Sequence, residues 1–222
     1  MIDVVIPAAG VGKRMGCNFP KQYLKINGLT ILEITLKKML KLPNLGKIIL
    51  VLNQEDEYFK ELNIYSEKIV TTIGGKERSD SVLNGLKVAS TEYVLVHDAA
   101  RPLVDILDIE KLVKECTNDD VGILASKVAD TIKKGNQDLS ISETVDRSSL
   151  FRALTPQYFK TSLLIKAYED AVLKNKALTD EASAMELLGY HPKLVLSNSL
   201  NIKITEPNDL LFARLLMEKE LV

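Results

Sequence analysis

The chain of 222 residues has the length of one large α/β domain, and its 46% hydrophobic content suffices for a sizeable core. Its 29 basic residues nearly balance 30 acidic ones, which argues against a nucleic-acid partner, because such proteins use a basic surplus to release counterions. No apolar run is long enough to span a bilayer and no signal-peptide pattern is present, so we expect a cytoplasmic protein with no membrane partner.

The chain alternates between β-branched runs and amphipathic helical patterns. Strands are predicted at residues 2–6, 47–52, 93–97, 121–125 and 201–205. Helical patterns cover residues 31–39, 82–86, 109–113, 164–171 and 178–189. Several strands are apolar at successive positions, which is typical of strands buried on both faces. Residues 1–222 are therefore predicted to form a single Rossmann-like α/β domain with a mostly parallel sheet, and ligands bind beyond the carboxyl ends of such strands.

Residues 128–154 interrupt this alternation and indicate two strands around the turn-like Lys134-Gly135-Asn136. Two isolated strands are marginally stable in water, so this hairpin arm should pack against something else. It either folds onto its own domain as an edge hairpin or exchanges with a second copy of the chain.

A glycine-rich segment, residues 7–16, follows the first predicted strand, and its backbone N–H groups could bind an anion. Gly10, Gly12 and Gly16 do not have the spacing of the dinucleotide fingerprint, and the segment lacks the Walker pattern. Its basic tail, Lys13, Arg14 and then Lys21, is either a solvated basic loop or a set of cations for phosphate chemistry. Such cations would stabilise the charge that develops when two phosphorylated reactants meet.

Two further segments supply candidate ligands. In residues 74–81, Ser79 or Ser81 either caps a helix or borders a base or ribose site. Asp98 ends a predicted strand, where it could bind magnesium or cap a turn. The adjacent His97 is expected to be a packed strand-end residue, and Arg101 is either a structural ion-pair partner or a phosphate ligand.

Two candidates lie near the C-terminus. Thr179 fits the N-cap of a helix that ends at Gly189. Lys203 lies on the predicted strand at 201–205. Its ammonium faces solvent unless that strand joins the sheet beside the glycine-rich segment.

With these pieces together, the chain resembles the 2-C-methyl-D-erythritol 4-phosphate cytidylyltransferase family of the non-mevalonate isoprenoid pathway. The resemblance covers nearly the whole chain and keeps the order of eight motifs: PAAGVGKRM, PKQYL, GGKERSDSV, VHDAARP, TVDR, ALTPQYF, TDEAS and NIKITEPNDL. It implies a CTP-dependent cytidylyltransferase that releases pyrophosphate, uses Mg²⁺ and forms a homodimer through the hairpin arm. Some relatives carry a fused cyclase domain, which we do not expect here.

The resemblance also implies roles for individual residues. The triphosphate would lie on Ala8, Ala9, Gly10 and Gly12, and the cytidine near Gly75 and Ser81. Charge at the α-phosphate would be stabilised by Arg14 and Lys21, while Asp98 would lie by the metal and the acceptor. The methylerythritol phosphate would be oriented by Arg147 and Lys203, with help from Arg101, Thr131, Thr155 and Thr179. Some of these residues are expected to come from a partner subunit.

Two other functions compete with this one. Ribitol-5-phosphate cytidylyltransferase is similar at the GG-x-x-R, TPQ-x-F and NIKIT segments, whereas PAAG, HDAAR, TVDR and TDEAS favour the methylerythritol enzyme. The other is a catalytically silent nucleotide-binding regulator. The joint presence of Arg14, Lys21, Asp98 and Lys203 argues against it, because a binding protein needs no cations for a transition state.

Overall fold

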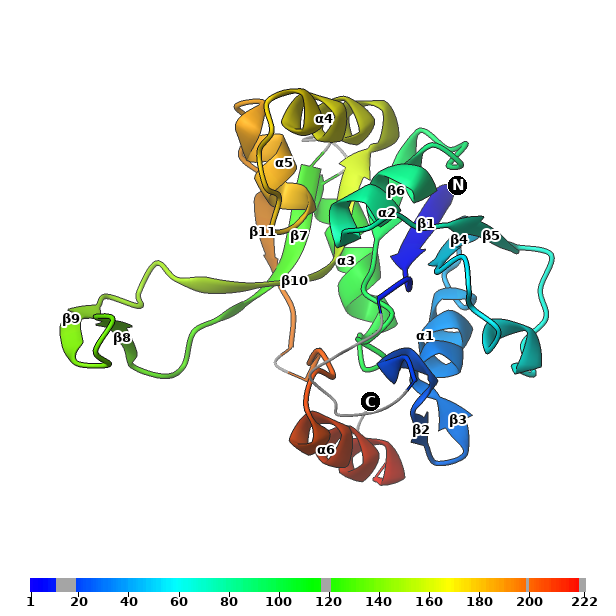
Figure 1. The fold of residues 1–222 in the computed structure, drawn as a ribbon, viewed down its shortest axis with the longest axis horizontal. Helices are drawn as coiled ribbons and strands as arrows, with labels where there is room; N and C mark the ends of the chain where they lie inside the picture. The colour runs from blue at the N-terminus through cyan, green and yellow to red at the C-terminus, as the bar shows by residue number, and fades with distance from the viewer. Residues whose placement is uncertain (11–18, 117–120, 199, 220–222) are drawn as a thin grey trace.

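A seven-stranded sheet forms the centre of the computed structural model, which describes residues 1–10, 19–116, 121–198 and 200–219 (Figure 1). The strands lie in the order β11-β7-β10-β6-β1-β4-β5. Their bounds are β1 Ile2–Pro7, β4 Leu45–Leu52, β5 Ile69–Ile73, β6 Tyr93–Val96, β7 Val121–Lys127, β10 Phe151–Lys160 and β11 Lys193–Leu196. Neighbouring strands are parallel, except that β10 is antiparallel to both β6 and β7. The prediction of one α/β domain with a mostly parallel sheet is therefore confirmed.

Helices cover both faces of this sheet, because successive apolar side chains of a strand point to opposite faces. On β1, Val4 and Ile6 join one apolar cluster and Val5 joins the other, and all three are fully buried. The first cluster includes side chains of α1 (Ile31–Met39) and α3 (Ile106–Cys116). The second includes side chains of α2 (Arg78–Leu86), α4 (Thr161–Leu173) and α5 (Glu181–Leu187).

A third apolar cluster joins the C-terminal helix to the segment after the glycine-rich loop. Helix α6 (Pro207–Glu218) contributes Leu210 and Ala213, which meet Ile26 and Ile204. The neighbouring short elements are η2 (Lys21–Tyr23), β2 (Lys25–Ile26) and β3 (Leu29–Thr30), while η3 (Phe59–Glu61) follows β4. No helix in the described ranges is both long and apolar enough to cross a membrane.

The predicted strand at 201–205 is wrong, because these residues belong to no ladder. The segment lies beyond the sheet, beside the turn that follows β6. There the Ile204 N–H donates to the Ala100 carbonyl at 2.8 Å, and the Ile204 side chain is fully buried. The β-branched pattern of residues 201–205 therefore reflects packing against α6 and the turn, and not pairing with a neighbouring strand. The edge strands β5 and β11 were not predicted, since they are short and largely unburied, so they lack a long run of buried positions.

The N-cap predicted at Thr179 is also wrong, because α5 begins one residue later. The N-cap is Asp180, whose carboxylate accepts from the Ser183 N–H at 2.9 Å. The Thr179 N–H donates to the Ser183 hydroxyl instead. Gly189, with φ +83°, follows the helix as predicted, in a conformation that glycine adopts without strain.

The residues predicted to form an arm include a separate two-stranded sheet, which projects from the body of the molecule (Figure 1). Strand β8 (Ile132–Gly135) pairs antiparallel with β9 (Ile141–Val145). The turn lies at 136–140, slightly later than the predicted Lys134-Gly135-Asn136, and the Asn136 N–H donates to the Ser140 carbonyl at 2.9 Å. Residues 151–154, expected in the arm, belong to β10 of the central sheet.

Candidate active site

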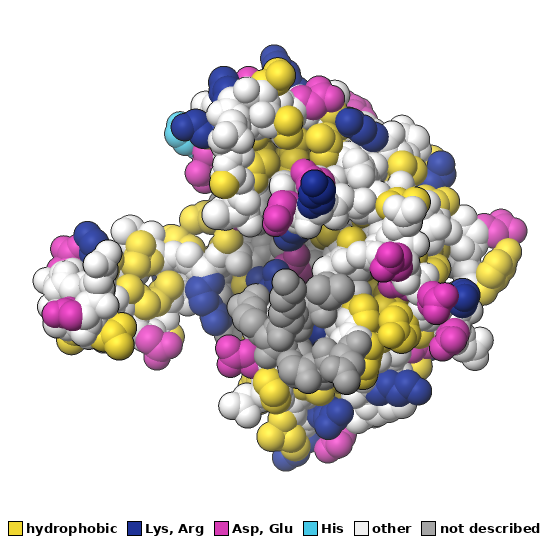
Figure 2. Space-filling model, in the orientation of Figure 1, with side chains coloured by type: hydrophobic (Ala, Val, Ile, Leu, Met, Phe, Trp, Pro, Cys, Tyr) yellow, Lys and Arg dark blue, Asp and Glu magenta, His cyan; other side chains and the backbone are white. Residues whose placement is uncertain are grey.

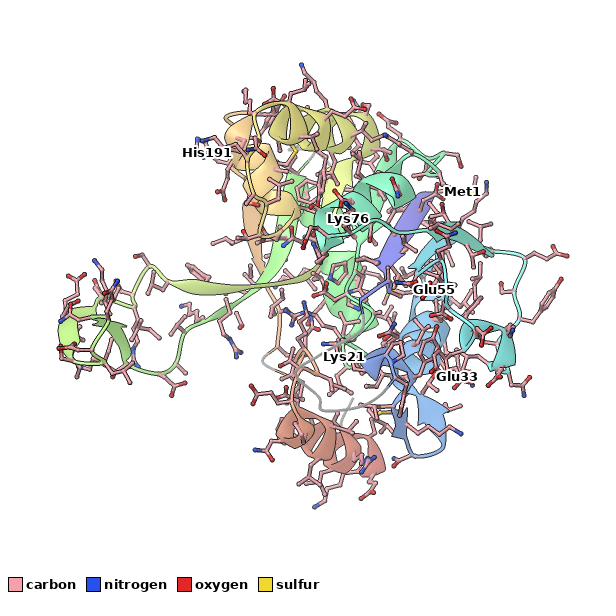
Figure 3. The ribbon with its side chains drawn as sticks, in the orientation of Figure 1. Met1, Lys21, Glu33, Glu55, Lys76 and His191 are labelled. Atoms are coloured by element: carbon pink, nitrogen blue, oxygen red, sulfur yellow. The ribbon has the colours of Figure 1, made fainter. Side chains whose placement is uncertain are left out.

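A cavity of about 320 Å³ opens at the carboxyl ends of β1 and β6, where parallel α/β sheets bind ligands. Its wall comes from segments that are distant in sequence: Pro7, Ala8, Ala9, Gly10, Lys21, Gln22, Gly75, Lys76, Glu77, Arg78, Ser81, Asp98, Ala99, Ala100, Lys203 and Thr205. Figure 2 shows basic and acidic side chains close together at the centre of this face. In Figure 3, Lys21 and Lys76 approach that centre from opposite sides.

The first wall of the cavity is the backbone that continues β1. The Ala8 N–H donates to the Val51 carbonyl at 2.8 Å, so the chain leaves the sheet in a defined direction. Ala8, Ala9 and Gly10, which the resemblance assigns to the triphosphate, line the cavity. Gly12, Lys13 and Arg14 lie outside the described residues.

The turn η2 presents Lys21 to the cavity, and three hydrogen bonds fix its place. The buried Gln22 amide Nε2 donates to the Ala8 carbonyl at 2.6 Å, and the Tyr23 hydroxyl donates to Asp56 at 2.7 Å. Lys21 Nζ donates to the Ile204 carbonyl at 2.7 Å. Lys21 is therefore held against both the glycine-rich segment and the C-terminal segment, although these are far apart in sequence.

The segment before α2 forms the opposite wall. The Ser81 hydroxyl accepts from the Gly75 N–H at 3.1 Å and donates to the Glu77 carbonyl at 3.2 Å. A methyl group added at Gly74 would lie 2.6 Å from the Ala9 side chain, so the two walls touch here. Gly75 and Ser81, which the resemblance assigns to the cytidine, thus lie on the same cavity as Ala9. The N-cap of α2 is Glu77, so neither Ser79 nor Ser81 caps the helix.

Asp98 forms the floor of the cavity, and its carboxylate is surrounded by cations. Oδ1 accepts from Arg78 at 3.1 Å, while Oδ2 accepts from Lys203 at 2.9 Å and from Arg101 at 3.4 Å. Burial alone would raise the pKa of Asp98, but the charges of Arg78, Lys203 and Arg101 hold that pKa well below its usual range. The carboxylate is therefore ionised, and Lys203 points into the site although no strand carries it.

Arg78 and its partner Glu181 were missed by sequence reasoning. Arg78 lines the cavity and bridges Asp98 to Glu181, whose side chain is fully buried. Both residues lie in motifs that were noted, GGKERSDSV and TDEAS. Their pairing depends on how α2 and α5 pack, and no spacing in the sequence encodes it.

Two predicted acceptor-binding residues, Arg101 and Thr155, lie beneath Asp98 and are buried. Arg101 donates to the Asn201 carbonyl at 2.8 Å. The Thr155 hydroxyl accepts from the Asp98 N–H at 3.0 Å and contacts His97 Nδ1 at 3.1 Å. Both residues therefore contact the floor of the cavity from below, and a direct role in binding the acceptor stays a prediction.

Three other predicted residues lie away from the cavity of this single chain. Thr131 and Arg147 are exposed in the arm, where the Arg147 guanidinium donates to the Ala129 carbonyl. Thr179 is exposed before α5. Among the described candidates, the structure thus gathers Ala8, Ala9, Gly10, Gly75 and Ser81 with Lys21, Asp98 and Lys203, and it leaves these three outside.

His97 is fully buried at the end of β6, as expected for a packed strand-end residue. Its Nε2 lies 3.1 Å from the Arg101 carbonyl, which can only accept, so this nitrogen carries the proton. Nδ1 then accepts from the Thr155 hydroxyl. Burial lowers the pKa of His97 to about 4, which keeps the ring neutral.

This neutral histidine predicts how stability depends on pH. An unfolded histidine binds a proton near its ordinary pKa of about 6.5, before the folded one does, so stability falls as the pH falls from there towards 4. We expect a loss of about 2 kcal/mol in unfolding free energy between about pH 7.5 and 5, measured by urea denaturation. His97→Gln should reduce this loss, and the exposed His191→Gln should retain it. An unchanged pH dependence in His97→Gln would contradict the assignment.

Comparisons with known proteins match this chain over nearly its whole length. The sequence model of the family described as IspD, 2-C-methyl-D-erythritol 4-phosphate cytidylyltransferase, matches residues 2–219. The relative of that name from Pseudoalteromonas translucida (strain TAC 125) is 50% identical over 223 residues, which cover 99% of this chain and 92% of the relative. The one from Aliivibrio fischeri (strain MJ11) is 46% identical over 224 residues, which cover 98% and 94%.

Solved structures are similar over the same length. The 2-C-methyl-D-erythritol 4-phosphate cytidylyltransferase of Francisella tularensis has a TM-score of 0.83 at 36% identity, covering 96% of this chain and 98% of that one. The structure of that name from Thermus thermophilus has a TM-score of 0.85 at 30% identity, covering 98% of both chains. The chain therefore belongs to the 2-C-methyl-D-erythritol 4-phosphate cytidylyltransferase family.

Proposed function

We propose that this chain is a cytoplasmic cytidylyltransferase of isoprenoid precursor biosynthesis. It transfers CMP from CTP to 2-C-methyl-D-erythritol 4-phosphate, which forms 4-diphosphocytidyl-2-C-methyl-D-erythritol and pyrophosphate. One observation carries the proposal: cations from three distant segments, Lys21, Arg78 and Lys203, line one cavity beside the backbone of the glycine-rich segment. Such an arrangement suits two phosphorylated reactants that must approach each other.

The reaction is a displacement at phosphorus. An oxygen of the acceptor phosphate attacks the α-phosphorus of CTP, and a new P–O bond forms. The bond from the α-phosphorus to the bridging oxygen breaks, and its electron pair leaves with pyrophosphate. Because the attacking oxygen is already anionic, no strong general base is needed, and the protein contributes position and positive charge.

Positive charge in such a site can change the reaction rate strongly. A unit charge pair about 4 Å apart contributes on the order of 4 kcal/mol at an effective dielectric constant near 20. That energy corresponds to a rate change of roughly a thousandfold. We assign this stabilising role to Lys21 and to Arg14, and we assign the orientation of the acceptor to Lys203 and to Arg147 of a second subunit.

The magnesium ion belongs to this proposal. No group of three or more His, Cys, Asp or Glu side chains suited to a metal occurs in the described part of the chain. Asp98 offers a single ionised carboxylate, and both of its oxygens already accept from cations. These residues fit an ion held mainly by phosphate oxygens and water, with Asp98 beside it. When bound, the ion would neutralise charge on the phosphates.

An acceptor panel tests the function. Pyrophosphate release with CTP should be faster with 2-C-methyl-D-erythritol 4-phosphate than with ribitol 5-phosphate, because the HDAAR, TVDR and TDEAS motifs favour the former. The measurement is kcat/KM for each acceptor with a coupled pyrophosphate assay. Equal or better turnover of ribitol 5-phosphate would contradict the acceptor assignment, and binding of CTP without turnover would favour the silent regulator.

Removing Lys21 should separate catalysis from binding. If Lys21 stabilises the transition state, Lys21→Ala should lower kcat by roughly a hundredfold or more and change CTP binding little. Lys25→Ala removes an exposed lysine of the neighbouring strand β2 and is the matched control, which should keep the wild-type kcat. An effect of Lys21→Ala that is confined to KM would reassign the residue to ground-state binding.

The arm supports a homodimer, because its two strands lack a core of their own, and Thr131 and Arg147 flank these strands. If each site takes Arg147 from the partner, Arg147→Ala and Lys203→Ala should each be inactive alone. Mixing them under conditions that exchange subunits should restore about a quarter of the wild-type activity, because half of the random dimers then hold one intact site. No recovery in a sedimenting dimer, or a monomer at micromolar concentration, would refute arm exchange.

A further inference from the structure

The ion network at the floor of the cavity extends to a carboxylate that no predicted role includes. Arg78 Nη1 donates to Glu181 Oε1 at 2.8 Å, and Nη2 lies 3.4 Å from Oε2. The Glu181 side chain is 0% exposed, and the Tyr168 hydroxyl donates to its Oε1 at 3.0 Å. The same guanidinium donates to Asp98 Oδ1 through Nε at 3.2 Å and Nη2 at 3.1 Å. Arg78 therefore bridges a carboxylate of the cavity and a carboxylate of the core.

The cations around Asp98 differ in how firmly they are held. Arg78 is fixed by two carboxylates, and Arg101 also donates to the Asn201 carbonyl. Lys203 reaches Asp98 through one atom, Nζ at 2.9 Å, and its side chain is 37% exposed, against 11% for Arg101. Lysine also has a flexible stem and no planar fork, so a single contact fixes it weakly. Lys203 is thus the cation best able to move.

Movement of Lys203 requires that Asp98 keep another counter-ion. A buried carboxylate that loses its partner is strongly destabilised, because neither water nor another charge compensates it. Arg78 would remain on Asp98, because Glu181 prevents it from turning away. Burial would lower the pKa of Arg78, but Glu181 and Asp98 raise that pKa above its usual value, so Arg78 keeps its charge.

We propose that Glu181 and Arg78 are positioning residues: a fixed ion pair that holds Asp98 in place and compensates its charge when Lys203 leaves it for a substrate phosphate. The inference rests on the proposed function, because the destination of Lys203 is a phosphate. It assigns different roles to the two cations that face Asp98 from the cavity wall. Arg78 stays with the protein, and Lys203 contacts the substrate.

A double-mutant cycle tests the pair. Glu181→Gln keeps the shape of the side chain and removes its charge, and Arg78→Lys keeps a positive charge but cannot bridge two carboxylates. Each variant should lower kcat on the order of tenfold and leave KM for CTP within about twofold. The double variant should be no slower than the slower single variant, because the two residues act as one unit. Losses that multiply, or a wild-type kcat in Arg78→Lys, would overturn the proposal.

Two controls separate this effect from loss of folding. Thermal unfolding of every variant gives its folded fraction, and kcat is expressed per folded enzyme. Lys174→Ala removes the Asp170–Lys174 pair on the surface of α4 and should keep the wild-type kcat. If the wild-type enzyme turns over CTP and Glu181→Gln does so equally well, the pair has no positioning role. If the wild-type enzyme fails with every acceptor, the proposed function itself is wrong.

A crystal structure with a non-reactive CTP analogue and 2-C-methyl-D-erythritol 4-phosphate gives a readout that does not depend on turnover. Lys203 Nζ should lie within hydrogen-bond distance of a phosphate oxygen and away from Asp98, while Arg78 keeps its contacts with both Asp98 and Glu181. In Glu181→Gln crystals with the same two ligands, Lys203 should remain on Asp98. A wild-type complex in which Lys203 stays on Asp98, or in which Arg78 leaves Glu181 for the nucleotide, would overturn the proposal.

Discussion

The site depends on the buried carboxylate of Asp98 and the cations that keep it ionised. Taken out of water, a single carboxylate would become protonated or destabilise the fold. Here Arg78, Arg101 and Lys203 come to it from α2, from the turn after β6 and from the C-terminal segment. Each of these segments is therefore anchored at the same point. The electrostatic requirement of one side chain determines where three parts of the chain meet, and their meeting forms the floor of the cavity.

The cavity has more cations than carboxylates, and this excess of positive charge makes the site suitable for phosphates. Within the network, Arg78, Arg101 and Lys203 face the carboxylates of Asp98 and Glu181. Lys21 also lines the cavity, where it donates to the Ile204 carbonyl beside Lys203. Cations thus outnumber carboxylates before any ligand binds. A polyanion entering the cavity would meet side chains that are already oriented and partly desolvated, so little reorganisation is needed during the reaction.

The fold and about half of the candidate site could be predicted from the sequence. The physical reason differs from one group of residues to the next. Buried parallel strands have continuous apolar runs, so β1, β4, β6 and β7 were recognised from local pattern. Ala8 to Gly10 and Asp98 follow such strands directly, and the topology then places them at one edge. Arg78 with Glu181, and the route of residues 201–205, depend on packing between distant segments, which no local pattern encodes. Thr131 and Arg147 are exposed in the arm, away from the cavity, and their role in the site stays a prediction.

Strand β10 connects the arm to the floor of the cavity, because it begins where the arm ends and carries Thr155 beneath Asp98. Insertions or deletions should therefore be tolerated in the arm before residue 151, and they should disrupt the floor of the cavity after it. The exposed turn at 136–140 can change length without altering any buried contact. Between Phe151 and Ala153, where β10 pairs regularly with β7, one added residue would turn the Thr155 hydroxyl to the other face of the sheet and remove the support of Asp98.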